Sequence, residues 1–258
     1  MRDIDDSQAP LLEHLIELRK RLLLSFAALG AAFLVCLYFA RPIFAFLVQP
    51  LVHAGQGKII YTQIFEAFFV EIKVAFFAAL MLAFPVIANQ LWQFVAPGLY
   101  KKEKRALLPF LWATPVLFLM GASLAYFVAL PLALHYLLGF QGDLGGIQQE
   151  ALPAVGNYLS FVMQFLFGFG LAFLLPILLM LLERAGIVTR SQLVRFRRYA
   201  IVVNCAVAAV LTPPDVGSML LLAVPLIVLY ELSLIGIWFT ERRRAREGEE
   251  ESDALTGA

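Results

Sequence analysis

Residues 11–40 read LLEHLIELRKRLLLSFAALGAAFLVCLYFA, a charged stretch followed directly by a long apolar run. The apolar part, residues 22–40, is close to the roughly 20 residues that a helix needs to cross the hydrocarbon core of a bilayer. A secretory signal is excluded, because its apolar core is only about 7–15 residues long and because five further apolar runs follow here. The stretch therefore predicts the first span of a polytopic membrane protein.

The composition of the whole chain supports a membrane protein. Of its 258 residues 61% are hydrophobic and 15% are charged, and the mean hydropathy is +0.82. Soluble domains are only about 45–50% apolar. The net charge of +1 gives no basic surface for nucleic acid, and Cys36 and Cys205 lie in apolar runs as small core residues, not as a disulfide framework.

Hydropathy predicts an all-α fold with six transmembrane helices in one domain, residues 1–240, followed by a disordered cytoplasmic tail, residues 241–258. Prolines inside several spans should kink them, because proline removes a backbone donor. The fifth run has thirteen residues, about 20 Å of helix, so the last two spans are expected to be short. The predicted spans are 22–40, 74–88, 107–130, 155–182, 199–211 and 216–239.

The distribution of lysine and arginine predicts the orientation. Seventeen of these twenty residues lie in the amino-terminal segment, near 101–105, in 184–198 and in 242–246. Because cytoplasmic segments of membrane proteins are enriched in lysine and arginine, both termini should be cytoplasmic, and the loops 41–66 and 131–154 should face the other compartment.

The segment 11–24 combines acids and cations on one face of an amphipathic helix, which should run along the cytoplasmic membrane surface into the first span. Glu17 stands three and four residues before Lys20 and Arg21, a spacing that suits ordinary ion pairs within a helix. Glu13 and Glu17, however, are also four residues apart, where like charges repel. The two acids could therefore form a patch that receives an external cation, and both interpretations stand.

A further acid, Glu103, lies among four cations in FVAPGLYKKEKR, residues 94–105, between the second and third spans. Alone, such a residue is usually a solvated loop charge. Together with Glu17, it could form a receptor for guanidinium groups, which bind carboxylates through two parallel hydrogen bonds.

Four motifs, HLIELRKRLL, FVAPGLYKKEKR, NYLSFVMQF and LTPPDV, occur in this order over residues 11–239. In these motifs the sequence resembles the TatC family, the receptor subunit of the twin-arginine protein translocase. The resemblance implies that Glu17 and Glu103 contact the twin arginines of a folded substrate's signal peptide, with Arg19 and Arg21 supporting the site.

The resemblance also implies a setting and partners. It places the chain in the bacterial cytoplasmic membrane, with the single-span proteins TatB and TatA, signal peptides, membrane lipid and further copies of the chain as partners. The proton-motive force, with no nucleotide or other cofactor, would drive transport.

Three positions inside or near the membrane bear on transport or partner contact. The family often has an acidic or amide residue near Leu174, whereas the amide of this span is Gln164, about 15 Å earlier along the helix. Met219 replaces a common glutamine, which predicts an apolar docking contact. Asp215 lies in the turn between spans five and six, which proline and aspartate favour.

The short fifth span suggests where a partner docks. A helix of thirteen residues leaves about 10 Å of hydrocarbon unmatched, which association with another helix can relieve. Ala206, Ala208 and Ala209 would permit close approach of a partner helix, or they could simply pack against span six.

The sequence lacks the motifs of a nucleotide hydrolase, an intramembrane serine protease and a metal site. No phosphate-binding GxxxxGK[ST] loop occurs, no histidine lies inside a span beside a serine, and the three histidines are too far apart to suggest a metal site. A small-solute secondary transporter is the alternative, but spans one to three and four to six show no repeat.

Overall fold

The computed structural model describes residues 5–99, 104–145, 147–184, 186–212 and 216–256. These residues form helices joined by short connections, with one antiparallel hairpin of two short strands. The elements are α1 (Asp5–Tyr38), α2 (Ala40–His53), α3 (Glu66–Leu99), α4 (Lys104–Leu124), the π-helical segment η1 (Ala125–Ala129), α5 (Leu130–Leu138), β1 (Gly142–Leu144), β2 (Ile147–Gln149), α6 (Val155–Ala172), α7 (Leu175–Arg184), α8 (Arg190–Arg195), α9 (Arg197–Leu211) and α10 (Val216–Thr256).

Five segments of the described chain are long and apolar enough to cross a membrane. The short α9 has fifteen residues, about 22 Å of helix against a hydrocarbon core of about 30 Å. The prediction of an all-α polytopic membrane protein is therefore confirmed, and the short fifth span is α9. The five long segments are Leu15–Tyr38, Glu66–Phe94, Leu111–Leu138, Val155–Arg184 and Met219–Arg242.

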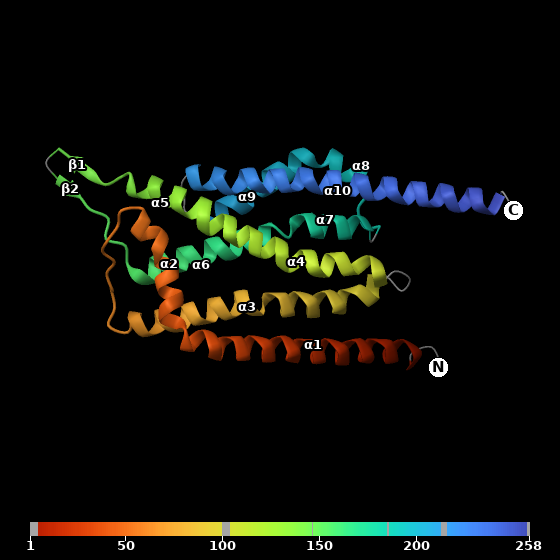
Figure 1. The fold of residues 1–258 in the computed structure, drawn as a ribbon, viewed down its shortest axis with the longest axis horizontal. Helices are drawn as coiled ribbons and strands as arrows, with labels where there is room; N and C mark the ends of the chain where they lie inside the picture. Colours follow the sequence, from red (N-terminus) through yellow and green to blue (C-terminus); the bar gives the residue numbers. More distant parts are fainter. Residues whose placement is uncertain (1–4, 100–103, 146, 185, 213–215, 257–258) are drawn as a thin grey trace.

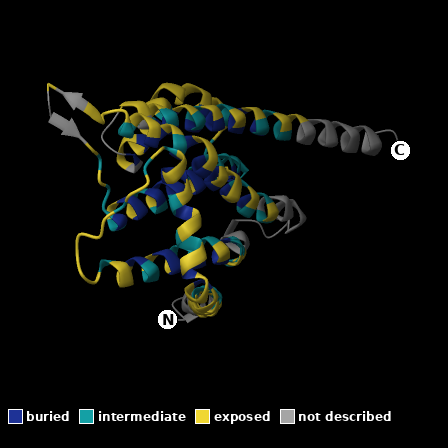
Figure 2. Cartoon of the chain, turned by 60° about the vertical axis from the view of Figure 1, so that its left-hand side comes forward, coloured by how far each residue is buried: buried dark blue, intermediate teal, exposed yellow. Residues whose placement is uncertain are grey.

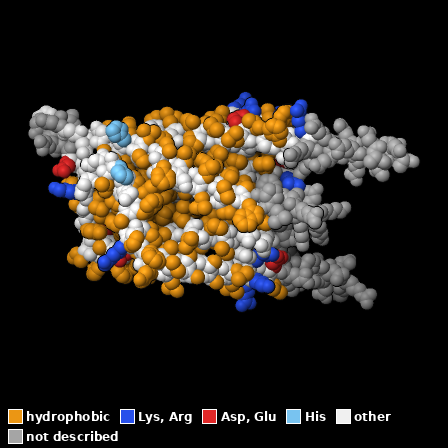
Figure 3. Space-filling view, in the orientation of Figure 1, with side chains coloured by type: hydrophobic (Ala, Val, Ile, Leu, Met, Phe, Trp, Pro, Cys, Tyr) orange, Lys and Arg blue, Asp and Glu red, His pale blue; other side chains and the backbone are white. Residues whose placement is uncertain are grey.

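The long helices run along the long axis of the molecule while α2 crosses them, and the start of α1 and the end of α10 lie at the same end of the bundle (Figure 1). We call this end the terminal end, and the opposite end, which carries α2 and the hairpin, the loop end. On the face shown in Figure 3, hydrophobic side chains form a broad belt and charged side chains lie toward the two ends. This distribution is that of a protein crossing an apolar layer.

Helix α1 lies at the edge of the bundle and packs mainly on α3. Only 6% of its apolar window is buried, and in Figure 2 its described residues are coloured mainly as exposed, with some intermediate ones. It is one straight helix, so its first turns extend the span along its own axis, whereas the sequence predicted a helix along the membrane surface. The straight course follows from a run of strong helix formers with no glycine before Gly30 and no proline after Pro10.

Two further elements differ from the sequence prediction. The loop after span one begins with α2, which was not predicted as a helix, and α10 continues to Thr256 through residues for which disorder was expected. Glutamate, arginine and alanine dominate this last segment, and all three have high helix propensity.

Among the described residues, one span breaks into two separate α-helices beside a proline. Helix α6 ends at Ala172 and α7 begins at Leu175, with Pro176 in its first turn, where proline is tolerated because its missing donor is not needed. Helix α10, in contrast, continues through Pro225. The third span is instead modified by η1, a single π-helical turn of the kind that bends helices.

Two tyrosines fix α2 to the bundle at the loop end. Pro50 lies inside α2 and has no N–H to donate to the carbonyl of Phe46, four residues earlier. The Tyr126 hydroxyl donates to this carbonyl at 2.7 Å, and its ring stacks on that of Phe46 with centroids 4.3 Å apart. The Tyr158 hydroxyl donates to the next carbonyl, Leu47, at 3.0 Å.

Glu66 joins the starts of α3 and α6. Its carboxylate accepts hydrogen bonds from the backbone N–H of Thr62 and Gln63 and, at 2.7 Å, from the N–H of Gly156 in the first turn of α6. A backbone bridge between Ile60 and Ala154 lies beside this contact. The two helices therefore begin at the same level of the bundle.

The centre of the bundle is closely packed around phenylalanine rings. Phe118 of α4 is fully buried, stacks on Phe84 of α3 with centroids 3.6 Å apart, and contacts Phe167 of α6 edge-on. Gly170 leaves room for this ring, since a Cβ atom there would lie 2.6 Å from Phe118. The glycine thus lets α4 and α6 approach closely, as small residues do between membrane helices.

Candidate functional site

A polar network joins α1 and α3 toward the terminal end. The Arg21 guanidinium donates to one oxygen of Glu17, Oε1, from Nε at 3.0 Å and from Nη2 at 2.5 Å. Its third nitrogen, Nη1, donates to Gln93 at 2.5 Å and to Gln90 at 3.5 Å, both on α3. Gln93 in turn donates to Asn89 at 3.0 Å. The network fixes both the Arg21 side chain and the carboxylate of Glu17.

The second oxygen of Glu17, Oε2, accepts no hydrogen bond from any residue that the structure describes. The Glu17 side chain is 36% exposed and that of Arg21 is 21% exposed. Because a carboxylate has about four acceptor positions, Glu17 can bind a second guanidinium without releasing Arg21. Among the described residues, the site is therefore a carboxylate that is held through one oxygen and leaves the other without a partner.

The structure brings some of the predicted site residues together. The ion pair between Glu17 and Arg21 is confirmed, and it is the i, i+4 pair expected from the helix. Arg19 and Lys20 are exposed and make no ion pair within the described part of the chain. Glu103 lies outside the described residues, between the end of α3 at Leu99 and the start of α4 at Lys104.

Sequence reasoning missed the partners of Arg21 on α3. The signal was present in ANQLWQ, residues 88–93, where three amides interrupt an apolar run at spacings of three and four. This spacing places them on one face of a helix. Amides on one face inside an apolar span indicate a polar partner on a neighbouring helix.

The positions inside the membrane are separated from one another. Gln164 is exposed on α6, whereas Leu174, beyond the end of α6, packs against buried side chains between α3, α4 and α7. Gln164 therefore does not occupy the place of Leu174. Met219 is half-buried against the main core, and Asp215 lies outside the described residues.

The alanines of α9 face in different directions. Ala208 is fully buried in the main core, while Ala206 and Ala209 are exposed. The exposed face of α9 also carries Val202 and Val210, which are 66% and 77% exposed. This face is apolar and has no neighbour within the described chain.

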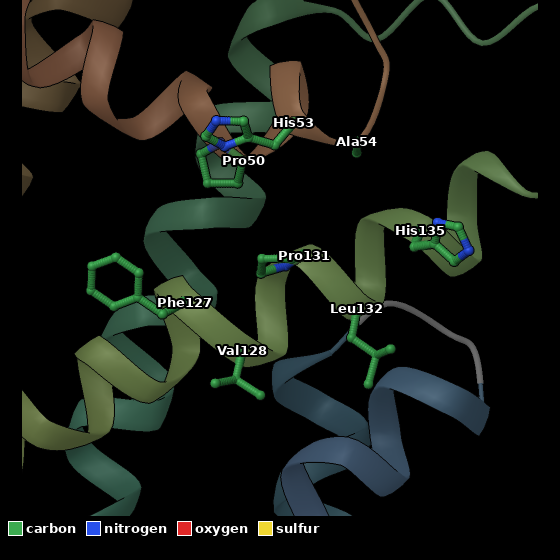
Figure 4. A pocket seen from close by; sticks show the side chains of 8 residues that line it. All are labelled: Pro50, His53, Ala54, Phe127, Val128, Pro131, Leu132 and His135. Atoms are coloured by element: carbon green, nitrogen blue, oxygen red, sulfur yellow. The ribbon is translucent and has the colours of Figure 1, made fainter.

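A cavity of about 470 Å³ at the loop end contains two histidines, His53 from α2 and His135 from α5 (Figure 4). Its other lining side chains are apolar. The described residues hold no group of three or more metal-ligating side chains, and two histidines fall short of the three or four protein ligands of a typical zinc site.

The fold and the network together define a polytopic α-helical membrane protein with a carboxylate–guanidinium network at one end of its bundle. Comparison with known proteins gives the family. The profile of the Sec-independent protein translocase protein (TatC) matches residues 13–225. The chain is 47% identical over 244 residues to the TatC protein of Magnetococcus marinus strain MC-1, covering 94% of this chain and 89% of that protein. It is 41% identical over 239 residues to that of Escherichia coli strain K12, covering 92% and 90%.

Solved structures agree with the sequence comparison. A crystal structure of the twin-arginine translocase receptor TatC is 40% identical, superposes with a TM-score of 0.73 and covers 86% of this chain and 96% of that one. The receptor in the detergent DDM gives a TM-score of 0.75 at 39% identity, with coverage of 86% and 98%. The chain belongs to the TatC family, the receptor subunit of the bacterial twin-arginine translocase.

Membership confirms several predictions. The chain is a multi-pass bacterial membrane protein of the twin-arginine protein transport pathway, and it is a receptor subunit and not an enzyme. The six-helix fold of this family accounts for α9 as the short fifth span beside the five long ones. The family also implies other translocase components and signal peptides as partners.

Proposed function

We propose that this chain binds twin-arginine signal peptides of folded proteins at its cytoplasmic face through Glu17 and Glu103. The observation that carries the proposal is that Arg21 holds Glu17 through Oε1, while no described residue donates a hydrogen bond to Oε2. A peptide guanidinium that donates to Oε2 would make the same kind of contact that Arg21 makes with Oε1. Glu103, in the connection that follows α3, supplies the second carboxylate.

The cations near the site have separate roles in this proposal. Arg21 positions Glu17 through its bonds to Gln90 and Gln93, so the carboxylate is ordered before a peptide arrives. Arg19 and Lys20 are exposed and hold this end of α1 at the level of the lipid headgroups. Arginine is preferred over lysine as the ligand, because its planar guanidinium can donate two N–H groups to Oε2 in the way that Arg21 donates two to Oε1.

The terminal end of the bundle is assigned to the cytoplasm. Both chain ends lie there, and the segments rich in lysine and arginine adjoin it. By the positive-inside rule, this end faces the cytoplasm and the loop end faces the opposite compartment. The signal peptide then meets the site before any part of the substrate has crossed the membrane.

Transport itself needs partners in this proposal. The exposed apolar face of α9 accepts a transmembrane helix of TatB or TatA, with Ala206 and Ala209 allowing close approach. Met219 in the first turn of α10 and Asp215 just before α10 in the sequence are the further candidate partner contacts. Other copies of the chain complete the receptor, and the proton-motive force drives transport.

Site-specific photo-crosslinking tests the signal-peptide site. A photoreactive residue at position 17 or 103 should capture a twin-arginine peptide, and a peptide with both arginines changed to glutamine should not be captured. Glu241 is the control, since it is a partly exposed glutamate toward the same end of the bundle that faces Arg190 on a different helix. Equal capture at positions 17 and 241 would contradict the proposal.

A further inference from the structure

A groove in the belt of the protein is apolar except at one end. It lies between α1, α3 and α6 and encloses about 450 Å³. Phe33 of α1 forms one wall and contacts Phe76 edge-on, with ring centroids 6.3 Å apart. Phe76 and Leu80 of α3 and Phe167 of α6 form the apolar part. Its two polar side chains are Lys73 and Gln164.

The two polar side chains lie at the same end of the groove, toward the loop end of the bundle. Lys73 is seven residues from the start of α3, about 10 Å, and Gln164 is nine residues from the start of α6, about 14 Å. These distances can be compared directly, because the hydrogen bond from Gly156 to Glu66 holds the two helix starts at one level. Leu80 lies about 10 Å deeper than Lys73 along α3.

This depth places Lys73 close to a lipid headgroup. The second span has 29 residues, about 43 Å of helix, so about 6–7 Å extends beyond a 30 Å hydrocarbon core at each end when the span is centred. The Cα atom of Lys73 is then about 4 Å inside the hydrocarbon boundary, and a lysine side chain reaches from there to the phosphate level.

Within the described chain, nothing neutralises this lysine. Lys73 is exposed and makes no ion pair, whereas both nearby glutamates on α3 are engaged. Glu71 faces Arg41 at 3.5 Å, and Glu66 binds the backbone of Thr62 and Gly156. Gln164 likewise makes no hydrogen bond among the described residues. A cation and an amide without partners at the membrane boundary fit an anionic ligand with hydrogen-bond acceptors.

We propose that this groove binds one anionic phospholipid of the leaflet at the loop end, with its phosphate at Lys73 and an acyl chain along the phenylalanine-lined part. Gln164 donates to an ester carbonyl of the lipid. The order of polar and apolar residues along the groove matches the head and tail of a lipid. A transmembrane helix fits less well, because it would need a carboxylate at this depth and would continue past a groove of this size.

A photoreactive lipid tests the proposal. The purified chain is placed in nanodiscs of phosphatidylcholine with a small fraction of phosphatidylglycerol that carries a diazirine on an acyl chain. Labelling should concentrate in the peptides that contain residues 72–80 and 163–167. The variant Lys73→Gln should reduce this labelling roughly fivefold, since one lysine near the surface contributes about that factor to anionic lipid binding.

Lys58→Gln is the matched control, because Lys58 is an exposed lysine at the loop end that does not line the groove. It should leave groove labelling unchanged. The proposal is wrong if Lys58→Gln reduces the labelling as much as Lys73→Gln, or if a phosphatidylcholine probe labels the groove equally. It is also wrong if a photoreactive residue at position 164 captures a protein helix and no lipid in native membranes.

Discussion

The hydroxyl of Tyr126 compensates for a proline, and removing it should destabilise the protein measurably. Pro50 leaves the carbonyl of Phe46 without its helical donor, and Tyr126 supplies the missing hydrogen bond at 2.7 Å. The substitution Tyr126→Phe removes only the oxygen. It keeps the ring that stacks on Phe46, so the loss reports the hydrogen bond and not the packing.

The size of the effect follows from burial. Tyr126 is 7% exposed, so water does not readily replace the lost donor. An unsatisfied buried carbonyl costs about 1–3 kcal/mol. For a chain of this size, each kcal/mol lowers the melting temperature by about 2–4 °C, which gives an expected decrease of about 2–12 °C.

Thermal unfolding in detergent measures this decrease, and two further variants show whether the lost hydrogen bond causes it. Tyr136→Phe is the control, since Tyr136 is 47% exposed and its hydroxyl makes no hydrogen bond within the described chain. Pro50→Ala restores an N–H for the Phe46 carbonyl, so Tyr126→Phe should cost less in that background. The reasoning is refuted if Tyr126→Phe and Tyr136→Phe melt alike, or if Pro50→Ala leaves the cost of Tyr126→Phe unchanged.

Three further predictions concern topology, partner docking and packing. A reporter fused to the carboxyl terminus should be cytoplasmic and one inserted near Gln148 should be external, and the reverse result would overturn the orientation. A cysteine at Val210 on α9 should crosslink to the transmembrane helix of TatB or TatA more than a cysteine at the equally exposed Trp112 on α4. Equal crosslinking at the two positions would show that α9 is not the docking face. Gly170→Ala should destabilise the protein by about 1–3 kcal/mol in the same unfolding assay, because the new Cβ atom would lie 2.6 Å from the Phe118 ring. Gly30→Ala is the control and should be neutral or stabilising, because a Cβ atom there meets nothing within 4 Å.

The spans and their type could be predicted from the sequence, because each long apolar run must form a helix to satisfy its backbone in lipid. The break before Pro176 and the continuous helix at Pro225 could not be distinguished in this way. The sequence shows only that each proline lacks a backbone donor, and packing around each one decides whether the helix ends there. Helix α2 was missed because its fourteen residues are too short for a hydropathy signal and depend on contacts with Tyr126 and Tyr158.

The candidate site was predicted in part. Glu17 and Arg21 pair at a spacing that any helix imposes, so the sequence was sufficient for that contact. The bonds from Arg21 to Gln90 and Gln93 join residues about seventy positions apart, and they depend on how α1 and α3 pack. That Lys73 has no ion-pair partner among the described residues could not be recognised either, because its neighbours on α1 and α6 are known only from the folded chain.

The most direct test of the central claim is the affinity of the purified chain for a twin-arginine signal peptide and for the same peptide with two lysines. Wild type should prefer the arginines, because Glu17 and Glu103 each offer a carboxylate to a guanidinium. Glu17→Gln should lose most of this preference and should bind the arginine peptide about tenfold more weakly. This factor is at the lower end of the range for a hydrogen bond to a charged group, because the Glu17 side chain is partly exposed to water. The variant should still fold, and its melting temperature provides that check. An unchanged preference for arginine in Glu17→Gln would contradict the account.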